Sequence, residues 1–245
     1  MRIQYMSDLH LEFLNEPPFI RKKSDVLCLC GDIGYPFSNI YRDFLISVNN
    51  TFEKVFLISG NHEYYNLGPN KGKSMDQINY QIESIILSNN LTNISFLNNS
   101  YEDYKGFRFT GTILWSHINN PYYLVNDFGQ IDNMNIEFYN HLHAKSCKFI
   151  EDTISRSEIP IIMLTHHMPS YDLIDDVYKT SSYNKFNQCF ASDCSKYFVH
   201  PVKIWIYGHT HKPKVSLFNN IKFVCNPGGY PEEGNNINII NLIEV

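Results

Sequence analysis

Five short runs of mostly apolar residues constrain the fold of this 245-residue chain more than any other feature. Runs of this length, bounded by turn-forming residues, are typical of buried β-strands. Segments with a helical period lie between several of them, at residues 40–48, 78–86 and 137–154. Strands that alternate with helices predict an α/β protein whose central strands are largely parallel. The five runs cover residues 3–6, 26–30, 55–58, 161–164 and 204–207.

The C-terminal third follows a different pattern. Residues 215–218 and 221–225 flank an Asn-Asn pair, which predicts a β-hairpin, and residues 237–240 predict a further strand. We therefore expect two mixed sheets in a single domain that spans residues 1–245. Two segments are interpreted as insertions that wall a substrate pocket, because each is polar or aromatic and follows a motif described below. These segments are residues 64–74 and 171–200.

The charge of the chain argues against one class of partner. It has 20 basic and 25 acidic residues, a net charge of −5, and its Lys and Arg residues are scattered. Duplex-binding proteins depend on a basic stripe that neutralises phosphates, whereas the short basic run here is residues 21–23. We therefore expect no extended nucleic acid as a partner.

The cellular location is predicted from two further features. No apolar stretch reaches the roughly 18 residues of a membrane span, and Asp8 interrupts the N-terminus too early for a signal peptide. The six cysteines form no Cys-x-x-Cys pair, which is typical of buried thiols in a reducing compartment. We expect a cytoplasmic protein with no membrane partner. A zinc site at Cys189 and Cys194 is not favoured, because two further ligands at suitable spacing are missing. His141 and His143, two apart on a predicted helix, are expected at the surface.

Polar side chains follow each of the five predicted strands, at the point where the strand ends. Because ligands bind outside the carboxyl ends of the strands in α/β sheets, we expect these five tips to converge on one crevice. The tips are Asp8-Leu9-His10, Gly31-Asp32, Gly60-Asn61-His62-Glu63, Thr165-His166-His167 and Gly208-His209-Thr210-His211.

The side chains of the tips suit transition metals. Two carboxylates, one amide and at least four imidazoles favour manganese, iron, zinc or cobalt over calcium. These donors exceed what one tetrahedral site needs, so two metals that share a carboxylate are expected. Two divalent cations together with Asp8 and Asp32 leave a net charge of about +2, which attracts a phosphate ester. Water on such a metal has a pKa of about 7, so a metal-bridging hydroxide is the expected nucleophile.

In residue types and order, the five motifs resemble those of the calcineurin-like metallophosphoesterase superfamily, from residue 8 to residue 211. The resemblance implies a four-layer α-β-β-α sandwich and two divalent metals, with Mn²⁺ preferred and Fe, Zn or Co as alternatives. Asp32 would bridge the metals, and His62 would contact the phosphate and protonate the leaving oxygen. The other implied ligands are Asp8, His10 and His211 for the first metal and Asn61, His166 and His209 for the second.

The chain departs from the family pattern near His62. Many relatives read Gly-Asp-x-x-Asp, with a second Asp that orients the non-ligand histidine, and this chain has Tyr35 at that position. A backbone carbonyl or a carboxylate of the insertions, such as Asp172, is expected to orient His62 instead. His166 is chosen over His167 as the metal ligand, because the ligand in similar sequences directly follows the apolar strand.

The predicted function is the hydrolysis of a phosphate ester, either a monoester or a small diester, in a small molecule or nucleotide. Tyr35, His117 and His167 are further candidates for substrate contacts, with packing as the alternative for Tyr35 and a loop position for His117. A nuclease of the same superfamily and a non-catalytic interaction module on the same fold stay open. The full ligand set argues against the module, and the lack of a basic stripe argues against the nuclease. The sequence does not indicate an oligomeric state.

Overall fold

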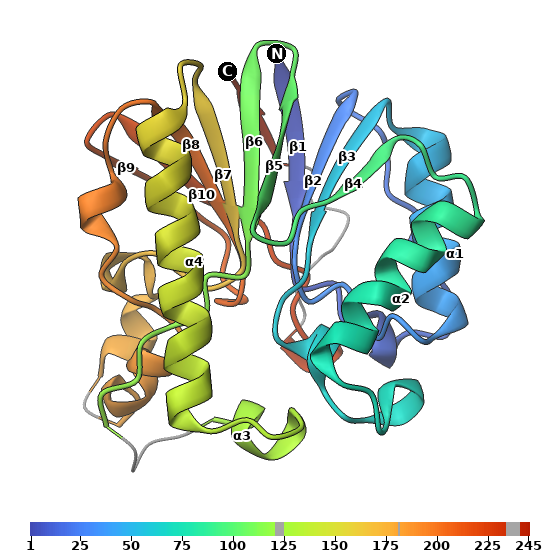
Figure 1. Ribbon diagram of the computed structural model, residues 1–245, viewed down its shortest axis with the longest axis horizontal. Coiled ribbons are helices and arrows are strands. Elements are labelled where there is room, and N and C mark those ends of the chain that lie inside the picture. The colour runs from blue at the N-terminus through green and yellow to red at the C-terminus, as the bar shows by residue number, and fades with distance from the viewer. Residues whose placement is uncertain (121–124, 181, 234–240) are drawn as a thin grey trace.

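Two β-sheets lie face to face in the centre of the computed structural model, which describes residues 1–120, 125–180, 182–233 and 241–245 (Figure 1). The first sheet has the strand order β11-β1-β2-β3-β4. Strands β1 to β4 run parallel, and β11 pairs antiparallel with β1. The strands are β1 (Arg2–Met6), β2 (Val26–Cys30), β3 (Lys54–Ile58), β4 (Ile94–Phe96) and β11 (Leu242–Glu244).

The second sheet has the strand order β5-β6-β7-β8-β10-β9. Its inner strands run parallel, whereas β5 and β9 pair antiparallel with their neighbours at the two edges. Both sheets are therefore mixed. The strands are β5 (Ser100–Tyr104), β6 (Phe107–Thr112), β7 (Ile161–Thr165), β8 (Val202–Tyr207), β9 (Lys214–Phe218) and β10 (Ile221–Cys225).

Helices cover the outer face of each sheet, so that the molecule has four layers (Figure 1). The first sheet is covered by α1 (Asn39–Thr51) and α2 (Met75–Ser88), and the second by α4 (Ile136–Arg156), which the short α3 (Asp127–Gln130) precedes. The predicted α-β-β-α sandwich is confirmed. Short 3₁₀ helices are η1 (Leu11–Phe13), η2 (His62–Tyr64), η3 (Gly68–Asn70), η4 (Tyr171–Leu173), η5 (Asp176–Lys179), η6 (Asn184–Cys189), η7 (Ser195–Tyr197) and η8 (Pro231–Glu233).

Local sequence signals explain where the helices begin. The Ser38 hydroxyl accepts a hydrogen bond from the Tyr41 N–H at the start of α1. Ser74 and Gln77 form a reciprocal capping box at the start of α2. Both helices then bury one apolar face on the sheet, because their buried residues recur with a helical period.

An apolar core joins the two sheets. Alternate residues of β2 point to opposite faces, so that Cys28 lies between the sheets and Leu27 lies beneath the helices. Phe56 of β3 stacks on Phe109 of β6 across the gap, with ring centroids 3.9 Å apart. This close packing fixes the carboxyl ends of β1, β2 and β3 relative to those of β7 and β8.

The five predicted strands correspond to β1, β2, β3, β7 and β8, and the predicted hairpin is β9 and β10. Its turn residues Asn219 and Asn220 have φ angles of 50° and 62°, as a two-residue hairpin turn requires. Four strands, β4, β5, β6 and β11, were not predicted. The strand expected at residues 237–240 lies outside the described residues. Among the helices that the structure describes, none is both long and apolar enough to cross a bilayer.

Candidate active site

The loops after five strands meet where the carboxyl ends of the two sheets face each other. Three loops come from the first sheet and two from the second, and potential ligand atoms of each group lie within 4.8 Å of one another. One group is Asp8, His10 and His211, and another is Asp32, His166 and His209. The structure thus brings together all six of these predicted side chains.

Asp32 belongs to the second group and also lies close to the first. Its Oδ2 is 3.3 Å from His166 Nε2 and 4.0 Å from His10 Nε2. Its Oδ1 accepts a hydrogen bond from the His62 N–H at 2.8 Å, which fixes the carboxylate. Burial alone would raise the pKa of Asp32, but the imidazoles of His166 and His62 hold it well below its usual range. Asp32 is therefore an anion that faces ligand atoms of both groups.

The first group presents imidazole lone pairs to a common point. His10 Nε2 and His211 Nε2 are 3.1 Å apart, and His211 Nε2 is 3.5 Å from Asp8 Oδ1. Each ring has a carboxylate behind it, because Nδ1 of His10 is 3.0 Å from Glu12 and Nδ1 of His211 is 2.8 Å from Glu233. Carboxylates in this position hold the proton on Nδ1 and turn Nε2 towards a metal.

The second group includes Asn61 through its amide oxygen. Asn61 Oδ1 is 3.0 Å from His166 Nε2, and its Nδ2 donates to Asp127 Oδ1 at 2.8 Å. The bond to Asp127 fixes the amide with its oxygen towards the group. His166 Nδ1 donates to the Cys30 carbonyl at 2.9 Å, which leaves Nε2 as the inward atom.

His209 supplies the best evidence that a cation fits the second group. Its Nε2 is buried and has no hydrogen-bond partner within the described part of the chain. Such an atom is rare in a native protein unless an ion or water completes its environment. Burial and the neighbouring imidazoles of His167 and His166 hold the pKa of His209 well below its ordinary value, so its Nε2 keeps a lone pair for a cation. His166 differs: burial opposes its protonation, but Asp32 raises its pKa to about 10. The residues present therefore fit divalent metals.

The backbone of the candidate ligands is strained. Asp8, His10, Asp32, His209 and His211 all have positive φ angles, between 47° and 67°. Left-handed conformations of such residues cost of order 1–3 kcal/mol each and persist where the surrounding structure enforces them. The strain is concentrated at the strand ends because these turns aim the side chains into the crevice.

Glu63 holds two of the turns at the strand ends in place through hydrogen bonds to their backbone. Its buried carboxylate accepts hydrogen bonds from the backbone N–H groups of Gly60 at 2.7 Å, Asp32 at 3.0 Å and Ile33 at 2.7 Å. Burial raises its pKa to about 7, because the carboxylate is removed from water. A methyl group on Gly60 would overlap the Asp32 carboxylate. Gly60 and Glu63 belong to one sequence motif, but the sequence did not predict that Glu63 would hold the turns or that Gly60 would lie against Asp32.

His62 lies at the edge of the crevice, with its imidazole oriented by Glu12. Its Nδ1 is 3.1 Å from Glu12 Oε1, and its Nε2 faces the pocket beside the Tyr230 hydroxyl, 3.1 Å away. Burial lowers the pKa of His62, but the Asp32 and Glu12 carboxylates raise it further and leave it above its ordinary value. The expectation for Asp172 is wrong: this residue is exposed, and its carbonyl accepts from Lys214.

Glu12, Asp127 and Tyr230 are site residues that sequence reasoning missed. Each contacts a predicted residue from outside the five motifs, and none follows a recognisable pattern. Glu12 lies two residues after His10, and this proximity was the only available signal.

Three residues that were predicted to contact substrate lie away from the pocket at this site. His167 has no exposed surface, because its ring packs on that of His209 with centroids 4.2 Å apart. His117 is exposed, and its ring lies 6.1 Å from that of His143. Tyr35 is half-buried, and burial together with Glu12 raises its pKa to about 12. None of the three is among the described residues that line the pocket at this site.

The pocket beside the candidate ligands has a volume of about 490 Å³. Asp32, His62 and His209 are among the polar residues that line it. Residues of the predicted insertion 171–200 also line it, and Tyr65 comes from the segment 64–74. The apolar and aromatic wall residues are Met168, Ile174, Tyr178, Tyr183, Phe186 and Phe190.

Comparisons with known proteins identify the family of the chain. The sequence model of the calcineurin-like phosphoesterase family matches residues 1–213. The chain belongs to this family. It is also 32% identical to the uncharacterized protein L509 of Acanthamoeba polyphaga mimivirus, over 100% of this chain and 97% of that protein. As a calcineurin-like phosphoesterase, the chain falls among hydrolases that act on phosphate esters and bind divalent metals.

Solved structures share the fold of this phosphoesterase. The crystal structure of phosphopantetheinyl hydrolase (PptH) from Mycobacterium tuberculosis matches 98% of this chain and 95% of its own, with a TM-score of 0.76 and 15% identity. The protein TT1561 of Thermus thermophilus matches 99% of this chain and 97% of its own, with a TM-score of 0.58 and 11% identity. At these identities the likeness concerns the fold.

Proposed function

We propose that this phosphoesterase is a dinuclear enzyme that hydrolyses a small phosphate ester. The observation that carries the proposal is the position of Asp32 Oδ2 between two groups of inward-facing ligand atoms. Asp8, His10 and His211 would hold one cation, and Asn61, His166 and His209 would hold the other. Paired metals of this kind neutralise the phosphoryl oxygens and activate water for in-line attack. Mn²⁺ is the metal that we propose first, because the ligands are oxygen and imidazole nitrogen.

His62 would act on the leaving group. Its Nδ1 faces Glu12, and its Nε2 lies at the pocket beside the Tyr230 hydroxyl, so a bound ester would accept the Nε2 proton in place of that hydroxyl. A general acid in hydrogen-bond reach contributes about 10²- to 10⁴-fold to a rate. The catalytic roles that we propose are therefore leaving-group protonation for His62 and metal bridging for Asp32.

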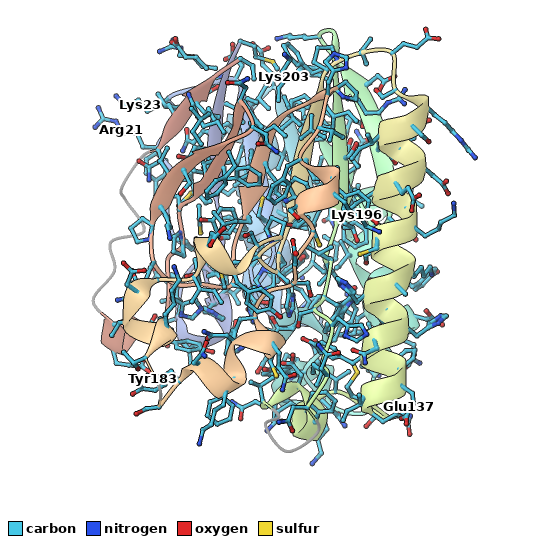
Figure 2. All side chains as sticks on the ribbon, turned by 90° about the vertical axis from the view of Figure 1, so that its left-hand side faces the viewer. Arg21, Lys23, Glu137, Tyr183, Lys196 and Lys203 are labelled. Atoms are coloured by element: carbon cyan, nitrogen blue, oxygen red, sulfur yellow. The ribbon has the colours of Figure 1, made fainter. Side chains whose placement is uncertain are left out.

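The pocket favours a substrate with one phosphate and an apolar or flat organic group. Its outer wall is aromatic, and none of the described lining residues is Lys or Arg. The basic side chains of Arg21, Lys23 and Lys203 lie at the end of the sandwich opposite Tyr183, which lines the pocket (Figure 2). Further phosphates on a substrate would meet Asp127 and Glu233 instead of a cation. We therefore propose a monoester or diester of a neutral alcohol with an aromatic or apolar group.

A panel of esters tests this function. The purified chain is supplied with Mn²⁺ and given aryl mono- and diesters, a nucleoside monophosphate, a phosphopantetheinyl ester and duplex DNA. We expect metal-dependent hydrolysis of at least one small ester. Cleavage of DNA without turnover of small esters would favour the nuclease, and the absence of turnover and of bound metal would favour the interaction module.

Two variants assign the chemistry to the site. Asp32→Ala is expected to lose metal and nearly all turnover. His62→Ala is expected to keep metal and lose about 10²- to 10⁴-fold in kcat. His141→Ala, at an exposed histidine of α4, is the matched control and should behave like the wild type. Normal turnover in either site variant would contradict the assignment.

A further inference from the structure

A further cluster of side chains that could hold a metal lies outside the active site, between α4 and the segment 171–200. His143 and Cys147 are four residues apart and therefore share one face of α4. Cys194, directly before η7, meets them from the other side. The ligand atoms of the three side chains all lie within 4.8 Å of one another, and His143 Nε2 is 3.3 Å from Cys147 Sγ.

The environment of His143 prepares it to bind a metal. The residue is buried, contrary to the surface position expected from sequence, because its Nδ1 reaches the Leu114 carbonyl at 3.1 Å. A carbonyl accepts only, so the proton stays on Nδ1 and the lone pair of Nε2 faces Cys147. A hydrogen bond of this kind to the second ring nitrogen is usual for histidines that bind metals.

We propose that His143, Cys147 and Cys194 form a zinc site that is separate from the active site. Ligand atoms around a tetrahedral zinc ion are about 3.6–3.8 Å apart, which is compatible with the spacing of the three atoms. Water would occupy the fourth position. Two thiolates select zinc over manganese, whereas the oxygen and nitrogen ligands of the active site accept manganese. The sequence does not reveal this site, because the residues that Cys194 meets lie on the distant helix α4 and Cys189 is not one of them.

The zinc would tie a wall of the substrate pocket to α4. Cys194 belongs to the segment 171–200, and its N–H donates to the Pro169 carbonyl at 2.9 Å, next to the pocket residue Met168. In the same segment, the Tyr197 hydroxyl donates to the Cys147 carbonyl at 3.0 Å, and Lys196 lies beside α4 (Figure 2). A metal at this junction would fix the wall without a direct contact to substrate.

Cobalt substitution tests the site directly. Co²⁺ bound by thiolates shows an intense ligand-to-metal charge-transfer absorption in the near ultraviolet, and Co²⁺ in the active site does not, because none of the ligands proposed there is a cysteine. We expect the full-length wild type to develop this absorption when Co²⁺ is added to saturation, and Zn²⁺ to abolish it. The absence of the absorption in the wild type would overturn the proposal.

Variants locate the thiolates. Cys147→Ala and Cys194→Ala should each lose the absorption, with a loss of affinity beyond the roughly 10- to 100-fold that removal of a ligand's hydrogen-bond partner costs. Cys189→Ala, in the same segment, and Asp32→Ala, in the active site, should both keep it. Retention of the absorption in both cysteine variants would refute the assignment. So would a Cys147–Cys194 disulfide found by peptide mass spectrometry in protein isolated without reductant.

The proposed role of the zinc in fixing the pocket wall is measured separately. This role rests on the proposed function. Zinc is removed with a zinc-selective chelator while the bound manganese content is held constant. We expect KM to rise several-fold with little change in kcat. An unchanged KM would exclude the role in the wall, and an inactive wild type would contradict the proposed function while the cobalt result still stands.

Discussion

Glu12 offers the sharpest test of how His62 is held. A single oxygen, Glu12 Oε1, lies 3.0 Å from His10 Nδ1 and 3.1 Å from His62 Nδ1. The side chain is only 4% exposed, so water does not readily replace it. Glu12→Ala therefore removes the acceptor of both rings at once, while it leaves every proposed metal ligand in place.

The size of the effect follows from these two contacts. Loss of the carboxylate behind a metal-binding histidine costs about 10- to 100-fold in metal affinity or activity. A complete loss of general-acid catalysis would cost at most about 10²- to 10⁴-fold. We expect Glu12→Ala to lower kcat for an alkyl ester by about 10- to 100-fold, or about 1.4–2.7 kcal/mol of transition-state stabilisation. Glu12→Gln keeps an acceptor and should lie between this variant and the wild type.

The assay compares leaving groups at saturating Mn²⁺. A nitrophenolate leaves without a proton, whereas an alkoxide needs one, so Glu12→Ala should lose far more activity with alkyl than with nitrophenyl esters. Glu16→Ala, at an exposed glutamate four residues later, is the control. Equal losses with both classes of ester, or no loss with either, would refute the positioning role of Glu12.

Three further variants test other parts of the site. Gly60→Ala should abolish metal binding, measured by elemental analysis, because its methyl group would overlap the Asp32 carboxylate; Gly129→Ala, where a methyl group meets open space, should not. Asp127→Ala should weaken metal binding about 10- to 100-fold in a calorimetric titration, because Asn61 loses the acceptor that orients its amide. Phe190→Ala should raise KM several-fold with little effect on kcat in steady-state kinetics, since it lines the pocket wall. Unchanged metal binding in Gly60→Ala or Asp127→Ala, or an unchanged KM in Phe190→Ala, would contradict these assignments.

The central strands and their tips could be predicted because their signals are local. An apolar run such as residues 26–30 is buried on both faces, and the polar residues that follow it must leave the sheet. The edge strand β5 was missed because it alternates between exposed and half-buried residues and contains two acidic side chains. Its place is decided by pairing with β6, which the sequence of either strand alone does not specify.

The supporting residues of the site could not be predicted for a similar reason. The partner of His62 is decided by which loop folds over it, so Glu12 and Asp172 were equally available from the sequence. In the structure η1 carries Glu12 under the imidazole, whereas Asp172 stays at the surface. Likewise, the contact between Cys147 and Cys194 arises only when η7 packs on α4. Contacts between distant segments need the tertiary fold.

Anomalous diffraction from crystals grown with Mn²⁺ would test the dinuclear site most directly. We expect two manganese peaks about 3.5–4 Å apart, both within bonding distance of the Asp32 carboxylate. A single peak, or two peaks of which one does not contact Asp32, would contradict the proposal that this residue joins two metals.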